Sequence, residues 1–350
     1  MAVGFSGSNG GVSNNLLAEP KVNIEVSYFI NNTCNLNCKH CYVGYENQED
    51  SLSVEEWKKA FEELISLNAT TFGNVGKEPL LSWEKTKELL IFLKEKRNEN
   101  PKIRFGLVTN LTLLTPKIAE KLNEILPDYL DVSLDGIKES HEFIRGNGNF
   151  EKTFNNLRII SEKFPNLLNK IFISFVLMKH NKTDFREMLN QLSKIKIKKI
   201  LISPYVTVES EKKIFSKQLG LTKEEIINFY KEIIKGKYLK ELDNFEIIIK
   251  NDRDTLEELM NLCIKENLIN TNKLLIDEYG VIFNQYEIGS NKIIINYIPE
   301  KDLFDLPIRI SHDGYVGNCY AQFFKDYPNR EEVLGNIRKT NIKEILKLAY

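Results

Sequence analysis

Hydrophobic and polar positions follow two periods that alternate along this chain. Short runs rich in β-branched and aromatic residues, such as 22–30, 69–75 and 103–110, have the composition of buried strands. Each is followed by a stretch in which apolar residues recur every three or four positions, which predicts an amphipathic helix. Regular alternation of the two element types favours parallel strands joined by right-handed crossovers.

Three of the predicted helices begin with residues that cap the free amide groups of a helix start. Ser53 is an expected N-cap, with Glu56 at the capping-box position three residues later. Ser82 is the expected cap of the next helix. Thr115 precedes Pro116, and proline is favoured at the first helical position. These signals predict where strands give way to helices.

Six strand–helix units are predicted, and the last strand ends near residue 206, with its helix at 222–236. A closed barrel of this type needs eight units. The predicted fold class is therefore α/β, a partial (β/α)6 TIM-like barrel over residues 21–236; an open doubly wound sheet is the alternative. In both folds ligands bind at the carboxyl ends of the strands.

The pattern changes in the last third of the chain. Residues 237–350 contain strand-like runs, two helical stretches and a hairpin signal at Asp313-Gly314. We expect a small C-terminal α+β appendage there. Residues 1–20 are rich in Gly, Ser and Asn and predict a flexible N-terminal arm.

Composition narrows the classes of partner. The chain of 350 residues has 48 Lys+Arg and 49 Asp+Glu, so no basic footprint points to nucleic acid. No apolar run reaches the roughly 20 residues of a membrane helix, and the N-terminus lacks a secretory signal. Five cysteines, three of them clustered, fit a disulfide framework poorly. The expected location is the reducing cytoplasm, without membrane or nucleic-acid partners.

The clustered cysteines are Cys34, Cys38 and Cys41, in the stretch "NNTCNLNCKHCYVGY" directly after the first predicted strand. A structural zinc site would need four converging ligands, with His40 as the fourth. A [4Fe–4S] cluster takes one thiolate per iron, so three cysteines leave one iron open for a substrate or cofactor. Free thiols gathered by chance are a further alternative. The spacing favours the iron–sulfur site.

The stretch "CNLNCKHCY", placed after the first strand of a six-unit chain, resembles the radical S-adenosylmethionine (SAM) superfamily over residues 22–236. The resemblance implies that Cys34, Cys38 and Cys41 hold one [4Fe–4S] cluster. It further implies that the open iron binds the amino and carboxylate groups of SAM. Reductive cleavage of SAM then yields a 5′-deoxyadenosyl radical that abstracts hydrogen from a C–H bond. The electron would come from a donor such as flavodoxin or ferredoxin.

A second stretch, "GNVGKEPLL", is similar to the Gly-Gly-Glu-Pro motif of that family. Gly76, Glu78 and Pro79 match, and the resemblance implies that they hold the SAM amino group. Lys77 departs from the motif, and we expect it to point away from the ammonium or to contact a carboxylate. A loop turn and helix start is the alternative for "GKEP" taken alone.

Two further sites agree with the resemblance. Thr109 and Asn110 end the third predicted strand where the family often has a Thr-Asn-Gly turn, and Asn110 is a candidate cofactor contact, although Leu111 replaces the glycine. "SLDGIKESHEFIRGNGNF" resembles the subfamily with C-terminal SPASM or twitch domains. That resemblance makes Ser133 and Arg145 candidates for the SAM ribose and carboxylate.

The roles of three other residues stay open at this point. Asp135 serves the substrate or the loop structure. His141 is assigned to helix packing or capping ahead of catalysis. Tyr205, at the end of the sixth predicted strand, is a candidate for substrate contact or for simple packing.

The C-terminal stretch with Gly314 and Cys319 resembles the G-x4-C start of a SPASM or twitch region, without its further cysteines. Too few thiols remain for a conventional second cluster, so one cluster is expected. Cys319 has three readings: a buried thiol, a catalytic hydrogen-atom donor, or a ligand to substrate or metal. Cys263, on a predicted helix beside Leu259 and Leu262, is expected in the core.

Three functions follow. The first is a radical SAM enzyme that epimerises or crosslinks a ribosomally synthesised peptide, as many SPASM- and twitch-like enzymes do. The second is a radical SAM dehydrogenase or epimerase of a sugar or other small metabolite, favoured by the lack of an evident leader-peptide domain. The third is a degenerate iron–sulfur protein without catalysis, for which Lys77 is the only support.

Overall fold

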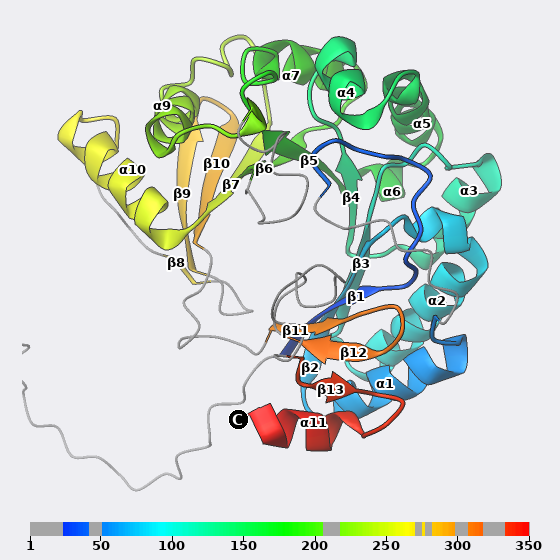
Figure 1. Ribbon diagram of the computed structural model, residues 1–350. Coiled ribbons are helices and arrows are strands. Elements are labelled where there is room, and N and C mark those ends of the chain that lie inside the picture. The colour runs from blue at the N-terminus through cyan, green and yellow to red at the C-terminus, as the bar shows by residue number, and fades with distance from the viewer. Residues whose placement is uncertain are drawn as a thin grey trace, which may run out of the picture.

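The computed structural model describes residues 24–41, 51–205, 218–269, 275–276, 282–297, 307–317 and 333–349. The strands within these ranges form one curved sheet of 13 strands (Figure 1). Its order is β13-β12-β11-β1-β2-β3-β4-β5-β6-β7-β10-β9-β8. The strands are β1 (Ile24–Phe29), β2 (Ala69–Gly76), β3 (Arg104–Thr109), β4 (Tyr129–Ser133), β5 (Ile171–Leu177), β6 (Lys199–Pro204), β7 (Glu246–Asn251), β8 (Leu275–Ile276), β9 (Ile282–Ile288), β10 (Asn291–Tyr297), β11 (Pro307–Ile310), β12 (Tyr315–Gly317) and β13 (Gly335–Asn336).

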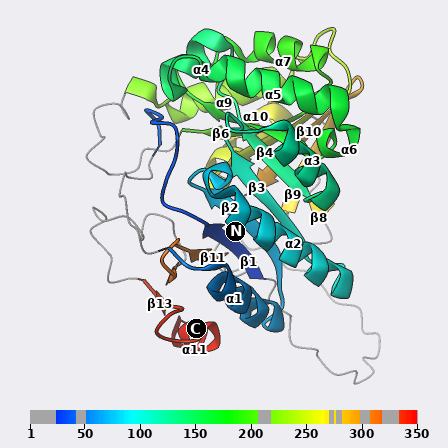
Figure 2. The ribbon, with the colours of Figure 1, turned by 90° about the vertical axis from the view of Figure 1, so that its right-hand side faces the viewer.

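Helices lie along the outer, convex side of this sheet, as Figures 1 and 2 show from two directions. They are α1 (Val54–Ser66), α2 (Trp83–Glu99), α3 (Pro116–Ile125), α4 (Lys138–Arg145), α5 (Asn149–Lys163), α6 (Pro165–Leu168), α7 (Phe185–Lys194), α9 (Lys223–Ile234), α10 (Arg253–Lys265) and α11 (Ile342–Ala349), with a short 3-10 turn at Pro79–Ser82. Among the described residues, no helix combines the length and the apolar character that crossing a membrane requires.

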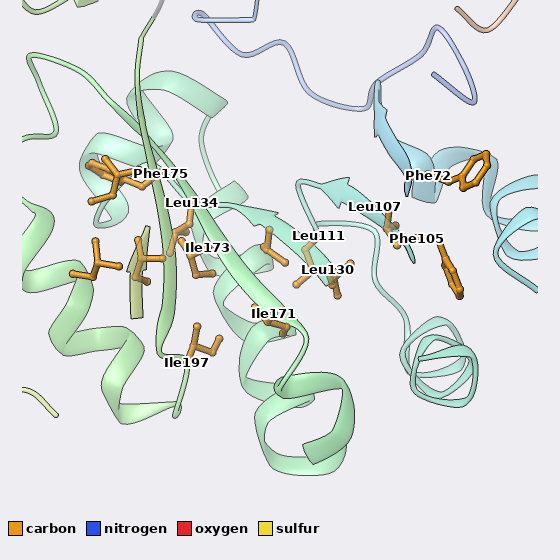
Figure 3. Close-up of a cluster of buried hydrophobic side chains, with 14 of the residues drawn as sticks. Phe72, Phe105, Leu107, Leu111, Leu130, Leu134, Ile171, Ile173, Phe175 and Ile197 are labelled. Atoms are coloured by element: carbon orange, nitrogen blue, oxygen red, sulfur yellow. The ribbon is translucent and has the colours of Figure 1, made fainter. Parts of the chain in front are cut away.

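Strands β1 to β6 are parallel and paired in sequence order. This confirms the predicted α/β class and the partial barrel. The core lies between the strands and the outer helices, where Phe72, Phe105, Leu130 and Ile173 are fully buried (Figure 3). The strands alternate: residues that face the helices are buried, and most of those that face the inside of the barrel are only partly covered.

The C-terminal region extends the barrel sheet at both edges. β7 pairs in parallel with β6 and then carries β10 and β9. At the other edge β11 pairs in parallel with β1 and carries β12. The expected boundary at residue 236 therefore coincides with no break in the sheet. The predicted hairpin at Asp313-Gly314 is present between β11 and β12, with Gly314 at φ +91°, a conformation that glycine adopts without strain.

The three predicted helix starts are present, and two of them have the expected side-chain capping bond. Ser53 and Glu56 form the complete capping box of α1, and Thr115 accepts the hydrogen bond expected of an N-cap at α3. Ser82 stands at the N-cap position of α2, as predicted, but its side chain makes no capping hydrogen bond. Its hydroxyl instead accepts a hydrogen bond from Asn31, 2.9 Å away.

Candidate functional site

The three clustered cysteines lie on the loop that follows β1, at the carboxyl ends of the parallel strands. Cys38 is buried at 8% exposure, and Cys34 and Cys41 are partly exposed. A turn between Cys38 and Cys41 is closed by the Cys41 amide, which donates to the Cys38 carbonyl at 3.1 Å. The Lys39 amide fastens the loop to α4 by donating to the Ile144 carbonyl at 2.9 Å.

The donor set fits a cluster better than a single ion. Among the described residues, no three His, Cys, Asp or Glu side chains converge on a point where one metal ion could sit. Zinc requires such convergence, whereas each thiolate of a [4Fe–4S] cluster binds a different iron. Burial raises the pKa of Cys38 to about 11, and the Arg145 charge partly opposes that shift. A positive charge beside this sulfur favours the thiolate that iron requires.

Asn31 joins the start of the cysteine loop to the loop that contains Gly76, Lys77 and Glu78. Its side-chain amide donates to the Glu78 carbonyl and to the Ser82 hydroxyl, each at 2.9 Å, and its Oδ1 accepts from the Lys77 amide at 3.1 Å. The side chain is buried. Two backbone hydrogen bonds join the same two loops: the Ile30 amide donates to the Gly76 carbonyl, and the Glu78 amide donates to the Thr33 carbonyl. The two predicted motifs are therefore held side by side.

Glu78 is a buried carboxylate, only 1% exposed. Its Oε1 accepts from the Thr109 hydroxyl at 2.7 Å and the Leu80 amide at 3.0 Å, and its Oε2 accepts from the Asn110 amide at 2.9 Å. Burial raises the pKa of Glu78, while these three donors act in the opposite direction. A carboxylate has about four acceptor positions, so one position remains for an ammonium group. Contact between Glu78 and SAM stays a prediction.

Asn110 connects this arrangement to the thiols. Its side-chain nitrogen Nδ2 lies 3.9 Å from the Cys34 sulfur and donates to Asn35 Oδ1 at 3.0 Å. Its Oδ1 accepts from the Thr112 backbone amide. Leu111, which stands where the resembled family has glycine, adopts φ +60°. The turn therefore keeps a left-handed residue despite the substitution.

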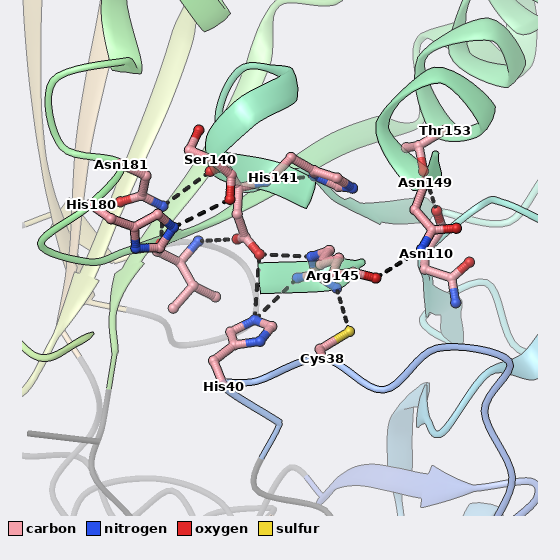
Figure 4. Close-up of polar contacts among 12 residues, drawn as sticks. Cys38, His40, Asn110, Ser140, His141, Arg145, Asn149, Thr153, His180 and Asn181 are labelled. Atoms are coloured by element: carbon pink, nitrogen blue, oxygen red, sulfur yellow. Dashed lines mark hydrogen bonds and ion pairs between the residues drawn. The ribbon is translucent and has the colours of Figure 1, made fainter. Parts of the chain in front are cut away.

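Arg145, which lies next to Cys38 in Figure 4, forms a buried ion pair with Asp135. The Arg145 Nε donates to Asp135 Oδ2 at 2.7 Å, and its Nη1 lies 4.0 Å from the Cys38 sulfur. His40 Nε2 lies 3.4 Å from Asp135 Oδ2 and 3.3 Å from Arg145 Nη2. Although burial raises it, the charges of Arg145 and His40 lower the pKa of Asp135 to about 2. His40 thus faces this pair and is not placed as the fourth ligand of a zinc site.

The same aspartate fixes the surrounding loops. Asp135 Oδ1 accepts from the Val176 amide at 3.0 Å, and its carbonyl accepts from Asn181 at 3.1 Å. The backbone amide of Asp135 donates to His141 Nδ1 at 3.2 Å. Burial, followed by the Arg145 charge, lowers the pKa of His141 to about 3. These contacts agree with the packing role expected for His141 and the structural option left open for Asp135.

The remaining candidates are placed around this centre. Ser133 ends β4 on the inner face, partly exposed. Gly76 and Pro79 flank Glu78, and a Cβ on Gly76 would meet the Phe29 ring at 3.0 Å. Tyr205 packs against a small buried cluster with Met178. Cys319 lies outside the described residues. Cys263 is fully buried on α10, which confirms its assignment to the core.

Two side chains that organise this site were not predicted to do so from the sequence. Asn31 carried no motif and was passed over, and His40 was weighed only as a zinc ligand. A signal for Asn31 was its position: a polar residue at the end of a predicted buried strand, three residues before the first cysteine. Such a residue must satisfy its polar groups within the protein, which here means with the neighbouring loop.

Comparison with known proteins finds a family model that matches part of this chain. The family model described as "Radical SAM superfamily" matches residues 28–192. Fe-coproporphyrin III synthase of Methanosarcina barkeri (strain Fusaro) is 30% identical over 191 residues, 54% of this chain and 45% of that protein. The chain spans less than half the length of the first curated relatives that it matches.

Solved structures resemble the fold over nearly the whole chain. SuiB of Streptococcus suis bound to precursor peptide SuiA matches with a TM-score of 0.66 and 13% identity, over 97% of this chain and 72% of SuiB. A structure described as native anSMEcpe with bound AdoMet and Cp18Cys peptide matches with a TM-score of 0.59 and 16% identity, over 93% of this chain and 80% of that one. At these identities the similarity shows the fold alone.

Proposed function

We propose that this chain, which matches the radical SAM family model over residues 28–192, is a radical SAM enzyme that binds a [4Fe–4S] cluster and SAM and modifies a ribosomally synthesised peptide. The reaction would begin with hydrogen abstraction from a C–H bond and end in epimerisation or a crosslink. Cys34, Cys38 and Cys41 would hold one cluster, and Glu78, Asn110, Ser133 and Arg145 would surround the bound SAM. A flavodoxin or ferredoxin would supply the electron.

One observation carries the peptide proposal. The fold similarity to SuiB in complex with SuiA covers 97% of this chain. The similarity to anSMEcpe, also with a bound peptide, covers 93%. Two proteins with bound peptides thus resemble this fold over nearly the whole chain, and this supports a peptide substrate.

The residues around the thiols have separate tasks. When bound, SAM and the cluster supply an organic radical able to remove hydrogen from an unactivated C–H bond. Asn31 holds the cysteine loop against the loop that carries Glu78, which fixes the distance between the metal ligands and the predicted ammonium site. Arg145 places a positive charge beside Cys38, and Asp135 keeps that guanidinium in place. A rigid frame of this kind orients the cofactor before reaction.

Redox balance favours epimerisation among the two outcomes. An epimerisation removes one hydrogen atom and returns one to the opposite face, so no net electron is lost. A crosslink removes two hydrogens from the substrate, and the second electron needs an acceptor. Cys319 is the proposed hydrogen-atom donor, and its thiyl radical would return to the thiol by taking a proton from water and a second electron from the flavodoxin or ferredoxin. Turnover of Cys319→Ala in deuterated water tests it, since unchanged product and unchanged labelling would remove this role.

The central experiment uses the full chain, reconstituted anaerobically and reduced. SAM should be cleaved to 5′-deoxyadenosine, and short peptides encoded beside its gene should gain a change in mass or, in deuterated water, one deuterium. The Cys34→Ala protein is the control and should do neither. An intact cluster without 5′-deoxyadenosine would contradict catalysis and support a degenerate iron–sulfur protein.

A second candidate function has its own support. Fe-coproporphyrin III synthase matches this chain at 30% identity, and other matching relatives include a protein named AdoMet-dependent heme synthase. These names favour a small-metabolite substrate, with a tetrapyrrole as the specific case. Iron coproporphyrin III is therefore a useful probe: a shift of its absorption band on mixing, together with inert peptides, would favour the metabolite over the peptide.

A further inference from the structure

The inner face of the barrel sheet carries polar side chains that the predicted cofactor site does not use. On β4 and β5, Leu130, Val132 and Ile173 face the helices and are fully buried. Their neighbours Asp131 and Ser174 face the inside and remain partly exposed. This side of the sheet is therefore accessible, whereas the side toward the helices is closed.

Asp131 has a carboxylate oxygen that receives no hydrogen bond from the described residues. Its Oδ2 accepts a hydrogen bond from the Ser174 hydroxyl at 3.2 Å. Its Oδ1 is buried and has no hydrogen-bond partner among the described residues. A buried carboxylate oxygen without a donor is costly, by about 1–3 kcal/mol, so the position favours an incoming donor.

The charges nearby support binding of a polar group. Lys250 on β7 attracts Asp131 electrostatically, and no ion pair joins the two in the described part of the chain. The side chain of Lys250 is exposed. An N–H donor facing Asp131 and a carbonyl facing Lys250 would match this arrangement, which is the pair of groups that an amide presents.

The position of Asp131 suits contact with a substrate below the cofactor. It lies two residues before Ser133 on the same face of β4, about 7 Å deeper along the strand. One step deeper, the Tyr129 ring covers the inner face: a Cβ on Gly106 would meet it at 2.6 Å, and one on Gly73 would meet its hydroxyl at 2.6 Å. A group that enters from the cysteine side thus reaches Asp131 before the inner face is closed.

We propose that Asp131, oriented by Ser174, is a substrate-binding residue that accepts an N–H hydrogen bond from the substrate. This inference rests on the proposed peptide substrate and adds the chemistry by which the barrel interior recognises it. Burial raises the pKa of Asp131 to about 6, while Ser174 and Lys250 oppose that shift. A cationic or amide donor would stabilise the ionised carboxylate and offset the free-energy cost of its burial.

The test compares Asp131→Asn, Asp131→Leu and Ser174→Ala with the unchanged protein, each reconstituted with cluster and SAM. The probe is an array of synthetic 12-residue peptides of randomised sequence, followed by affinity measurements on the strongest binders. We expect binding to weaken about 10- to 100-fold in Asp131→Leu and less in Asp131→Asn, because a charge-assisted hydrogen bond is lost. Cluster content and SAM cleavage without peptide should stay as in the unchanged protein, and the melting temperature should not fall.

The source of the N–H is resolved by changing the peptide. Replacing a backbone amide with an ester removes one N–H, and replacing lysine with norleucine removes an ammonium. The change that weakens binding to the unchanged protein, and has no further effect with Asp131→Leu, identifies the group that Asp131 contacts. Glu246→Gln is the matched control, since Glu246 is an inner-face acid already near Lys292, 3.6 Å away; its peptide affinity should not change.

The outcomes separate the two proposals. Peptides that bind the unchanged protein and Asp131→Leu equally would overturn the role of Asp131 while leaving the peptide function in place. An Asp131→Leu protein that loses cluster or melts much lower, with Asp131→Asn and Ser174→Ala binding normally, would also overturn it, because the residue would then be structural. An array without any binder to the unchanged protein would overturn both.

Discussion

At the scale of single residues, polar side chains that contact the cysteine loop organise the site. Asn31 was invisible to motif analysis because its contacts, at 47 and 51 positions along the chain, exist only in the fold. The cysteines themselves were predictable, since their spacing is local. Glu78 was identified from its motif, but the three donors that occupy it were not.

Asn31→Ala should weaken both the fold and the metal site. It removes four side-chain hydrogen bonds, two donated to Glu78 and Ser82 and two accepted from Thr33 and Lys77, which should cost about 2–3 kcal/mol of unfolding free energy. Urea denaturation of the apoprotein measures the stability, and iron content after reconstitution measures the site. Asn190→Ala, at a surface asparagine whose side chain donates to the nearby Glu187 on α7, is the control and should change neither. Iron content equal to that of the unchanged protein would contradict a positioning role.

Glu78→Gln separates a structural role from cofactor binding. One oxygen becomes an NH2 group, which must face the Asn110 amide or the donors from Leu80 and Thr109, so about 2 kcal/mol of stability should be lost. Thr109→Val removes one of these donors but keeps the carboxylate. Equilibrium dialysis with SAM should show weaker binding for Glu78→Gln than for Thr109→Val. Equal affinities for SAM would argue against direct contact with Glu78.

At the scale of elements, helix boundaries were predictable where their signals are local. Ser53 and Thr115 bond to amides three residues away, so sequence alone specifies them. Ser82 carries the same local signal, but the distant Asn31 uses its hydroxyl instead. A tertiary contact thus replaces the capping bond. The two residues are 51 positions apart, so local sequence signals do not reveal the contact.

The capping box of α1 also holds the C-terminal segment, which predicts a pH dependence. Arg338 donates to Glu56 at 2.6 Å, and mainly this bond, assisted by Ser53, lowers the pKa of Glu56 to about 2. Because the folded pKa lies below the ordinary value near 4.3, the stabilisation is present above that pH and is lost as the pH falls toward 2. The pair is 37% exposed at Glu56, so solvent screening limits it to about 1 kcal/mol or less.

Arg338→Gln should therefore lower stability at pH 7 by at most that amount. The difference from the unchanged protein should shrink as the pH falls from about 4.5 to 2, and it should be smaller in 1 M salt. Urea midpoints followed by circular dichroism across this range measure it. Lys343→Gln, at an exposed position on α11, is a charge-matched control. A difference that stays constant down to pH 2 would show that Arg338 acts through packing.

At the scale of the whole molecule, the sequence predicted the barrel but not how its ends are used. Six βα units were readable because each repeats the same local pattern. The pairing of β11 with β1 joins residues more than 280 positions apart, as in the bond from Arg309 to Ser27 at 3.1 Å. Such pairing leaves no periodic signal, so the C-terminal strands were expected as an appendage and are found as continuations of the sheet.

The number of clusters is a property of the complete chain and can be counted. The chain has five cysteines: three on the loop after β1, Cys263 fully buried in α10, and Cys319. One [4Fe–4S] cluster predicts about four iron and four sulfide ions per chain. Cys263→Ala should leave both counts unchanged, whereas Cys34→Ala should abolish most of them. Removing the metal with a chelator should lower the melting temperature, because a group bound only by the folded state stabilises it. A count near eight would contradict the single cluster, and a fall with Cys263→Ala would require α10 to open so that its thiol could bind iron.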